Sequence, residues 1–432
     1  MAVVTGNNAD NILQGTPQSD TLLGLGGNDL LYASAGNDTL DGGAGNDFAV
    51  YTGSPNAITI DLIAGSATGW GSDRLIGIEH VDGSFQNDRI SLSDGANFAN
   101  GNGGNDTIWG LAGSDNLLGG EGNDRLYAGT GNAENLDGQQ GNDFVAAGVG
   151  HQTRADGSDG IDTLSYADAS PARGLIINFS DNTMFTYDVA NNLISQQIYN
   201  FEHLEASSQG DNVLGGEGAN RIQGLAGNDT LDGWNGNDTV DGGAGNDTVL
   251  GGNGNDTVMG GAGSDTLYGG NGHDLLRGGA GADTIHAGEG NDTMLGEGGN
   301  DVLFGSNGGT EVFIGGAGRD VLHGFAGADR FVFNNVSESA VGANRDQIVD
   351  FFRSEGDKID LSAIDARTNQ AGDQAFSFVG GNAFSAAGQV RVVHQGGSEY
   401  LVQANVDANL APDIEIWVSF LGNAPAAQDF IL

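Results

Sequence analysis

The chain has 432 residues, of which 78 are glycine and none is cysteine, and its formal net charge is −44. The missing cysteines exclude disulfides and thiolate metal sites, and the charge excludes nucleic acid and anionic membranes as partners while favouring divalent cations. Apolar runs of about 18 residues are absent, so no membrane insertion is expected. Residues 1–6 lack the basic and apolar stretches of a secretory signal peptide, so we expect any export to use another route.

A nine-residue unit of the form G-G-x-G-x-D-x-U-x, in which U is apolar, recurs along most of the chain. Residues 242–250 show it as Gly-Gly-Ala-Gly-Asn-Asp-Thr-Val-Leu. From Asp229 to Asp301 the aspartates are nine residues apart, and an apolar residue stands two positions after each. This periodicity argues against disorder or simple solvation as the reason for the acidic composition.

Each part of the unit has a physical role. Glycine permits positive φ angles and close approach of stacked backbones, and the short D-x-U-x stretch is typical of a strand with one inward apolar side chain. Stacked turns bury these side chains together, so the pattern predicts an all-β fold, a parallel β-roll or β-solenoid. Aspartates of successive turns then form columns that repel without a counterion. Calcium suits such carboxylate and carbonyl oxygens, whereas magnesium demands a stricter geometry.

The candidate metal ligands are the aspartates at this position of the unit. They are Asp20, Asp29, Asp38, Asp47, Asp106, Asp115, Asp124, Asp143, Asp229, Asp238, Asp247, Asp256, Asp265, Asp274, Asp283, Asp292, Asp301, Asp320 and Asp329.

The unit resembles the nonapeptide of the RTX (repeats-in-toxin) family. The resemblance implies a parallel β-roll with calcium in its turns, in which alternate repeats on the same side share an ion. On the order of fifteen calcium ions are then expected, enough to neutralise most of the excess charge. The apo chain should be disordered at cytosolic calcium concentrations, so folding is expected to be linked to export.

Several turns depart from the pattern. Asp10 lies ten residues before the next aspartate of the series, and a one-residue insertion accompanies glutamate at Glu134 and Glu311. A longer side chain in a longer turn could still reach an ion, or the turn could be a calcium-free bulge, which we slightly favour. Asn97 and Asn220 offer neutral oxygens at the aspartate position, typical of weak or terminal sites.

The repeat is interrupted twice, which divides the chain into six segments. Residues 48–96 and 144–210 alternate β-branched and polar residues, so they predict strands with longer loops. They either continue the solenoid without calcium or provide a lateral surface for a glycan or another subunit. The segments are a first ladder (1–47), a calcium-poor interruption (48–96), a second ladder (97–143), a second interruption (144–210), a third ladder (211–329) and a C-terminal domain (330–432).

Glycine becomes less frequent after residue 329 and strand-like apolar segments take over. Phe-Val-Phe at 331–333, Asp-Lys-Ile-Asp-Leu-Ser at 357–362 and the final Asp-Phe-Ile-Leu at 429–432 resemble the C-terminal domain of serralysin-type metallopeptidases. The resemblance implies a β-sandwich-like domain with an uncleaved type I secretion signal. The family's calcium loop corresponds to 405–413, where two carboxylates are replaced by amides, so calcium binding there stays open.

The sequence does not indicate an enzyme. The chain has no H-E-x-x-H and no G-x-S-x-G motif, and no separate catalytic domain fits between the segments, so no enzyme is expected. We therefore expect a secreted or cell-surface structural protein of a surface layer, matrix or fibre. The alternatives are a calcium-dependent glycan- or surface-binding module and, third, a polysaccharide-modifying enzyme. Expected partners are calcium, the type I secretion apparatus, and either further copies of the chain or a cell-surface polysaccharide.

Overall fold

A computed structural model describes residues 1–368, 372–422 and 424–432. These residues form an all-β parallel solenoid, which confirms the predicted fold class, and the only helix among them is a single 3-10 turn, η1 (Ala427–Asp429). None of the described helical residues forms a segment long and apolar enough to cross a membrane. The chain divides into two compact units, Met1–Ser208 and Gln209–Leu432.

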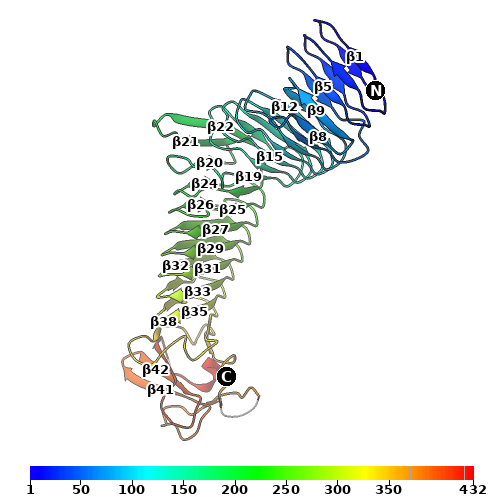
Figure 1. Cartoon of the computed structure of the whole chain (residues 1–432). Coiled ribbons are helices and arrows are strands. Elements are labelled where there is room, and N and C mark those ends of the chain that lie inside the picture. Colours follow the sequence, from blue (N-terminus) through cyan, green and yellow to red (C-terminus); the bar gives the residue numbers. More distant parts are fainter. Residues whose placement is uncertain (369–371, 423) are drawn as a thin grey trace. The chain divides into compact units, whose positions relative to one another are not determined.

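The solenoid is built from eighteen-residue coils that each supply one strand to each of two sheets. In the second unit β27 (Thr239–Ala244) pairs in parallel with β29 (Thr257–Ala262), so that Thr239 lies opposite Thr257. The alternating strands β28 (Thr248–Asn253) and β30 (Thr266–Asn271) pair in the same way on the other side. Figure 1 shows these coils stacked one on another.

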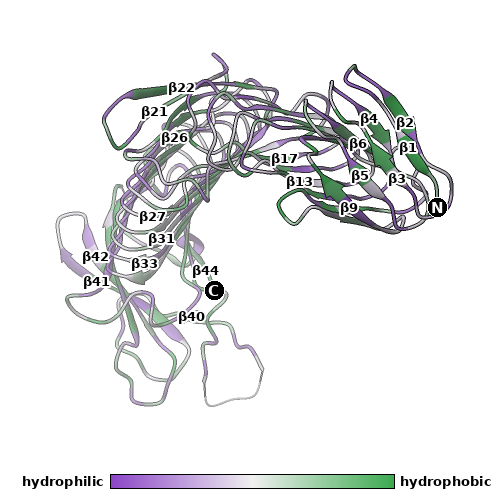
Figure 2. Ribbon diagram, turned by 45° about the horizontal axis from the view of Figure 1, so that its top comes forward, coloured by the Kyte–Doolittle hydropathy of each residue, from purple (hydrophilic) through white to green (hydrophobic). Residues whose placement is uncertain are grey.

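The core is a ladder of single apolar side chains. The middle residue of each short strand points inward, and Val240, Val249, Val258 and Leu267 are all completely buried. Full burial of one such side chain contributes about 1.5–3 kcal/mol, so no coil is stable alone and stacking is required. Figure 2 shows the hydrophobic colour on strands such as β2 and β4, in the first unit.

The strands of the first unit follow the same two-sheet plan. Its first sheet contains β1 (Val3–Thr5), β3 (Thr21–Leu23), β5 (Thr39–Asp41), β9 (Ser72–Ile76), β8 (Ser66–Thr68), β7 (Thr59–Asp61), β11 (Arg89–Ser91), β13 (Thr107–Trp109), β15 (Arg125–Tyr127), β17 (Phe144–Ala146), β19 (Thr163–Ser165) and β23 (His203–Glu205). Its second sheet contains β2 (Ile12–Gln14), β4 (Leu30–Tyr32), β6 (Phe48–Val50), β10 (His80–Asp82), β12 (Phe98–Gly103), β14 (Asn116–Glu121), β16 (Asn135–Gln140), β18 (Arg154–Asp156), β22 (Leu193–Tyr199), β21 (Thr183–Tyr187) and β20 (Ile176–Asn178).

Both sheets continue through the two interruptions, which differ from the ladders by antiparallel hairpins. In the first interruption β7, β8 and β9 pair antiparallel, while β9 pairs in parallel with β5, and β7 with β11. In the second, β20, β21 and β22 are antiparallel, and β22 pairs in parallel with β18. Each interruption is therefore a decorated part of the roll.

The strands of the second unit extend the same arrangement into the C-terminal segment. Its first sheet contains β25 (Arg221–Gln223), β27, β29, β31 (Leu275–Ala280), β33 (Thr293–Gly299), β35 (Val312–Gly318), β37 (Arg330–Val332), β39 (Lys358–Asp360) and β44 (Phe430–Ile431). Its second sheet contains β24 (Asn212–Leu214), β26 (Thr230–Asp232), β28, β30, β32 (Thr284–Glu289), β34 (Val302–Phe304), β36 (Val321–His323), β38 (Asp346–Phe351), β43 (Ile414–Phe420), β42 (Glu399–Asn405), β41 (Gln389–Gly396) and β40 (Ser377–Phe378).

Residues 330–432 are joined to both sheets of the roll. β37 pairs in parallel with β35 and with β39, and β38 pairs with β36. The antiparallel strands β41, β42 and β43 join β38 through β43. The sandwich-like domain expected for this segment stays a prediction.

Candidate metal sites

The aspartates of the repeat form two columns, one along each side of the roll. In each column the carboxylate oxygen Oδ1 of one aspartate accepts a hydrogen bond from the backbone N–H of the aspartate one coil earlier. The N–H of Asp238 donates to Asp256 Oδ1 at 2.8 Å, and the N–H of Asp256 donates to Asp274 Oδ1 at 2.8 Å. All nineteen predicted ligands are at most 3% exposed. Stacking of the strands therefore buries the carboxylates in rows eighteen or nineteen residues apart.

The second carboxylate oxygen, Oδ2, lacks a hydrogen-bond partner in most of these aspartates. In seventeen of the nineteen, Oδ2 is buried and has no hydrogen-bond partner: Asp29, Asp47, Asp106, Asp115, Asp124, Asp143, Asp229, Asp238, Asp247, Asp256, Asp265, Asp274, Asp283, Asp292, Asp301, Asp320 and Asp329. An isolated buried anionic oxygen is costly unless a cation or a donor compensates it.

The backbone of these seventeen turns is left-handed four residues before the aspartate, where φ lies between 61° and 119°. Glycine adopts this conformation without strain, as at Gly252. Leu225 and Trp234 adopt it too, with φ of 72° and 74°, although left-handed backbone costs a non-glycine residue about 1–2 kcal/mol. We call a turn with this conformation and an unpartnered Oδ2 an open turn.

Asp20 and Asp38 lie in turns of a second kind. The N–H and hydroxyl of Thr16 both donate to Asp20 Oδ2 at 2.6 Å. In the same way the N–H of Ser34 donates to Asp38 Oδ2 at 3.2 Å, and its hydroxyl lies 2.9 Å from that oxygen. We call these closed turns, because the residue four positions before the aspartate satisfies the oxygen that open turns leave unpaired. The Thr16 hydroxyl and the backbone donors hold the pKa of Asp20 at about 2.

The open turns fit a calcium ion. A Cβ atom placed on Gly251 would lie 2.6 Å from Asp256 Oδ2 and 2.6 Å from the carbonyl oxygen of Gly269, so the glycine leaves space bordered by two oxygens. Among the described residues no three acidic, histidine or cysteine side chains converge on one point. An ion would therefore take many of its ligands from backbone carbonyls, which calcium accepts readily as a hard, flexible cation.

Electrostatics within the columns also favour a bound cation. Burial raises the pKa of Asp106 to about 8, that of Asp301 to about 7 and that of Asp124 to about 6, with neighbouring carboxylates adding to the first two shifts. Each shift means that the buried site disfavours the carboxylate's own negative charge. A bound cation would remove that penalty.

Some acidic residues outside the predicted set occupy equivalent positions. Asp162 accepts the N–H of Asp143 at 2.7 Å and has an unpartnered Oδ2. The sequence contained its signal, since residues 157–165 read Gly-Ser-Asp-Gly-Ile-Asp-Thr-Leu-Ser, a degraded copy of the unit. Asp346 continues the other column by accepting the N–H of Asp320 at 2.8 Å, also with a buried, unpartnered Oδ2. The sequence does not indicate this role, because Asp346 follows Asp320 by twenty-six residues instead of the eighteen or nineteen of the repeat.

Glu134 and Glu311 stand at the aspartate position of their turns, but their side chains form different contacts. Glu134 Oε2 accepts the N–H of Asp115 at 2.6 Å, and Oε1 is buried without a partner, as in an open turn. Glu311 Oε1 accepts the hydroxyl of Ser306 at 3.0 Å, and its Oε2 is unpartnered.

At the start of the chain Asn11, rather than Asp10, takes the aspartate position, because its N–H donates to Asp29 Oδ1 at 2.7 Å. Asp10, which stands ten residues before Asp20, is therefore not a member of the aspartate series. Leu13, two residues after Asn11 and buried, is the sequence signal that could have indicated this register.

Polar groups of the loop 405–413 form hydrogen bonds with one another. Asn405 Nδ2 donates to the carbonyl of Ala411 at 2.7 Å, the N–H of Val406 donates to Asp413 Oδ2 at 2.7 Å, and Asn409 Nδ2 donates to Asp407 Oδ2 at 2.9 Å. Calcium binding in this loop stays a prediction.

Comparison with known proteins agrees with this geometry. The model of the RTX calcium-binding nonapeptide repeat matches residues 5–33, 14–49, 75–108, 82–117, 100–134, 214–249, 250–285, 277–309 and 305–335, together more than half of the chain. The chain belongs to this family of RTX repeat proteins, whose nonapeptides imply calcium binding.

Two solved structures illustrate the likeness. The AlgE6R3 subunit of the mannuronan C5-epimerase from Azotobacter vinelandii is 30% identical, over 38% of this chain and 80% of that one, with a TM-score of 0.19. The extracellular lipase LipA from Serratia marcescens is 14% identical, over 76% of this chain and 40% of that one, with a TM-score of 0.13. No curated protein matches the chain.

Proposed function

We propose that the protein is an extracellular calcium-binding protein whose roll folds when calcium fills the turns, with the predicted aspartates as ligands. The observation that carries the proposal is the buried, unpartnered Oδ2 in seventeen of them. Leaving such charges uncompensated costs on the order of several kcal/mol each. Calcium between neighbouring turns would offset that cost and lower the net charge of −44.

The geometry refines which turns we expect to hold ions. Asp162 and Glu134 join the second ladder, which in this proposal extends beyond residue 143. Asp20 and Asp38 are the weakest members of the set, since hydrogen-bond donors already satisfy their Oδ2 atoms. The total remains on the order of fifteen ions, of the kind that extracellular calcium modules bind at about 10⁻⁴–10⁻³ M.

Export is the second part of the proposal. Such affinities would leave the chain unfolded at cytosolic calcium concentrations, which suits passage through a type I secretion apparatus. The serralysin-like motifs of residues 330–432 support an uncleaved C-terminal secretion signal in that segment. RTX repeats are typical of secreted proteins, which agrees with an extracellular or cell-surface location.

We propose a non-catalytic structural or interaction role for the folded roll, as part of a surface layer, matrix or fibre. The support is the regular stack of coils, most of which is taken up by calcium turns and their apolar ladder. Polysaccharide binding is the second candidate function. One observation favours it, the 30% identity to a repeat subunit of an enzyme named for mannuronan.

The test is far-ultraviolet circular dichroism of the full chain, first stripped of metal and then titrated with calcium. We expect disorder in the stripped chain and β-structure at millimolar calcium, because the columns repel until ions occupy them.

Magnesium at the same concentration is the matched control. It should restore little structure, since magnesium requires near-octahedral coordination and retains its waters. A stripped chain that is already fully folded would contradict the proposal, and so would equal folding in magnesium.

A further inference from the structure

One outward face of the first unit combines aromatic rings with arginines. The strands β11, β13, β15 and β17 lie side by side in one parallel sheet and point their central residues into the core. Their outward side chains are Arg89, Ser91, Thr107, Trp109, Arg125, Tyr127, Phe144 and Ala146. None of the eight is acidic and two are arginine. We call this group the aromatic–arginine face.

The aromatic–arginine face contains a flat platform. The rings of Trp109 and Tyr127 stack with centroids 5.7 Å apart and planes inclined by only 9°. The guanidinium of Arg89 lies 4.9 Å from the Trp109 ring centroid, and that of Arg125 lies 4.3 Å from the Phe144 ring centroid. Such cation–π contacts orient the two arginines over the sheet.

Both arginines keep donors for a ligand. Arg125 Nε donates to the Tyr127 hydroxyl at 3.1 Å, which leaves the terminal guanidinium nitrogens. Neither Arg89 nor Arg125 forms an ion pair with any acidic residue in the described part of the chain.

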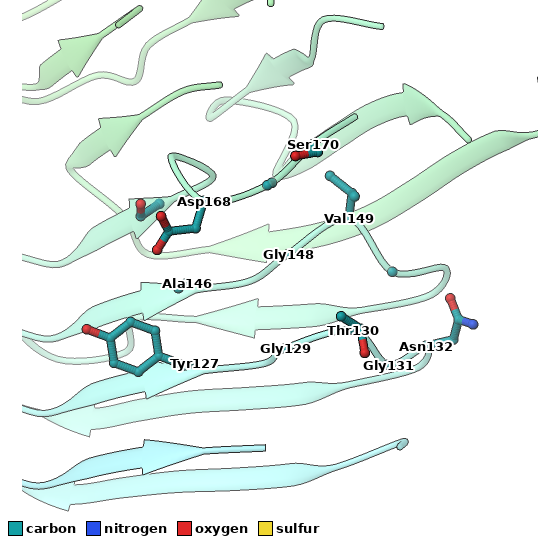
Figure 3. Close-up of a pocket in the computed structure, with 13 residues that line it drawn as sticks. Tyr127, Gly129, Thr130, Gly131, Asn132, Ala146, Gly148, Val149, Asp168 and Ser170 are labelled. Carbon is teal, nitrogen blue, oxygen red and sulfur yellow. The ribbon is translucent and has the colours of Figure 1, made fainter. Parts of the chain in front are cut away.

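A cavity of about 530 Å³ adjoins the platform at Tyr127. Its polar lining includes Thr130, Asn132, Ser165 and Asp168. Figure 3 shows Tyr127 and Asp168 at one side of the cavity and Asn132 at the opposite end. A volume of this size holds a small organic group, and hydroxyl, amide and carboxylate side chains can each bind sugar hydroxyls.

We infer that the aromatic–arginine face and this cavity form a binding site for an acidic polysaccharide, a chain of sugar rings that carry carboxylates. The apolar C–H faces of sugar rings pack on flat aromatic rings such as Trp109 and Tyr127. Guanidinium groups pair with carboxylates in a two-pronged geometry, and Arg89 and Arg125 lie two strands apart, on the order of 10 Å. A platform flanked by fixed cations therefore suits a repeating uronate better than a neutral sugar or a densely charged polyphosphate.

The inference rests on the proposed calcium-dependent fold, because the face exists only when the coils are stacked. The experiment is isothermal titration calorimetry of the full chain in millimolar calcium, with hexamers of galacturonate, mannuronate and guluronate and neutral hexamers of glucose and mannose. We expect at least one uronate hexamer to bind, at least tenfold more tightly than the neutral hexamers, and more weakly as salt increases.

Paired variants locate the site. Arg125→Gln and Trp109→Ala should each weaken uronate binding at least fivefold. Arg277→Gln and Tyr268→Ala, which change an exposed arginine and an exposed aromatic residue of the second unit, should leave it unchanged. Circular dichroism of each sample reports the fold separately, and Arg125→Gln provides the decisive reading if Trp109→Ala fails to fold.

Three outcomes would overturn the inference. These are a folded chain that binds no uronate, equal binding of neutral hexamers, and uronate binding that Arg125→Gln leaves intact. A chain that fails to fold in calcium would instead contradict the proposed function.

Discussion

At the scale of single residues, the position four before the aspartate separates the two kinds of turn. Leu225 is left-handed there and Asp229 Oδ2 is unpartnered, whereas Ser84 donates its N–H to Asp88 Oδ2 at 2.6 Å and its hydroxyl to Oδ1 at 2.7 Å. Strained backbone persists where something compensates it, and calcium is the compensation that we propose. A serine or threonine that donates to the aspartate carboxylate would then mark a turn that needs no ion, unlike Ser158, which is left-handed and leaves Asp162 Oδ2 unpartnered.

Two substitutions at Ser84 test this rule. Ser84→Gly should allow the left-handed conformation, free Asp88 Oδ2 and add one calcium ion per chain. Ser84→Ala removes the hydroxyl without favouring the left-handed backbone, so it should lower stability by about 1.5–3 kcal/mol and add no ion. Metal analysis of the dialysed proteins and thermal unfolding in saturating calcium measure the two effects. The rule is wrong if Ser84→Gly and the unmodified chain hold the same number of ions.

The raised pKa values of the columns predict how acid affects the metal-free chain. Burial raises the folded-state pKa of Asp106 to about 8 and that of Asp274 to about 7, well above the unfolded value of about 3.9. Protons therefore bind the folded state more tightly, so protonation stabilises it fully below about pH 4, and this contribution is lost as pH rises to about 7–8. Metal-stripped protein should contain more β-structure at pH 5 than at pH 8.

Circular dichroism of the metal-stripped chain across this range is the measurement. The same linkage predicts a higher calcium midpoint at pH 6 than at pH 8, because protons and calcium compete for the same carboxylates. A calcium midpoint that does not change with pH would show that the column carboxylates are not the ligands.

At the scale of elements, each strand contributes one residue to a continuous apolar ladder. Leu267 is completely buried between Val249 and Ile285, its partners in the neighbouring strands. Leu267→Ala should lower the free energy of unfolding by about 2–5 kcal/mol, since the rigid stack cannot collapse onto the cavity.

Thr266→Ala is the matched control for Leu267→Ala. It changes an outward, half-exposed residue of the same strand and should alter stability by no more than about 0.5 kcal/mol. Denaturant unfolding in saturating calcium compares the two variants. Equal losses would mean that the apolar ladder does not stabilise the roll.

The roll itself could be predicted from the sequence because one repeat specifies both its strand and its turn. The apolar residue two positions after each aspartate set the register, which the structure confirms from Leu22 onward, two residues after Asp20. The hairpins β7–β8–β9 and β20–β21–β22 could not be predicted in detail, since strand alternation does not reveal the pairing partner. The aromatic–arginine face was also missed, because Trp109 and Tyr127 are eighteen residues apart and meet only across stacked coils.

Closed turns were missed for a different reason. Thr16 and Ser34 look like ordinary variants of the second glycine, and only the hydrogen bonds to Asp20 and Asp38 show what they do. The left-handed backbone of residues such as Trp234 could not be predicted either, because large side chains normally argue against that conformation.

At the scale of the whole molecule, charge links folding to association. A chain with a net charge of −44 repels its own copies. On the order of fifteen calcium ions would neutralise roughly thirty of these charges, so the folded protein should have far less repulsion to overcome than the metal-free chain. This change would let a secreted chain stay dispersed until it reaches calcium.

If the roll is a component of a surface layer or fibre, calcium should therefore cause self-association as well as folding. We expect light scattering to show monomers in chelator and larger particles at millimolar calcium, with sheets or filaments visible by electron microscopy. Raising the sodium chloride concentration to about 1 M, where the screening length is about 3 Å, should promote association of the calcium-bound chain by screening its residual charge. Magnesium in place of calcium separates ion-specific folding from general screening. A calcium-bound chain that stays strictly monomeric under all these conditions would rule out the structural role and leave polysaccharide binding as the function to pursue.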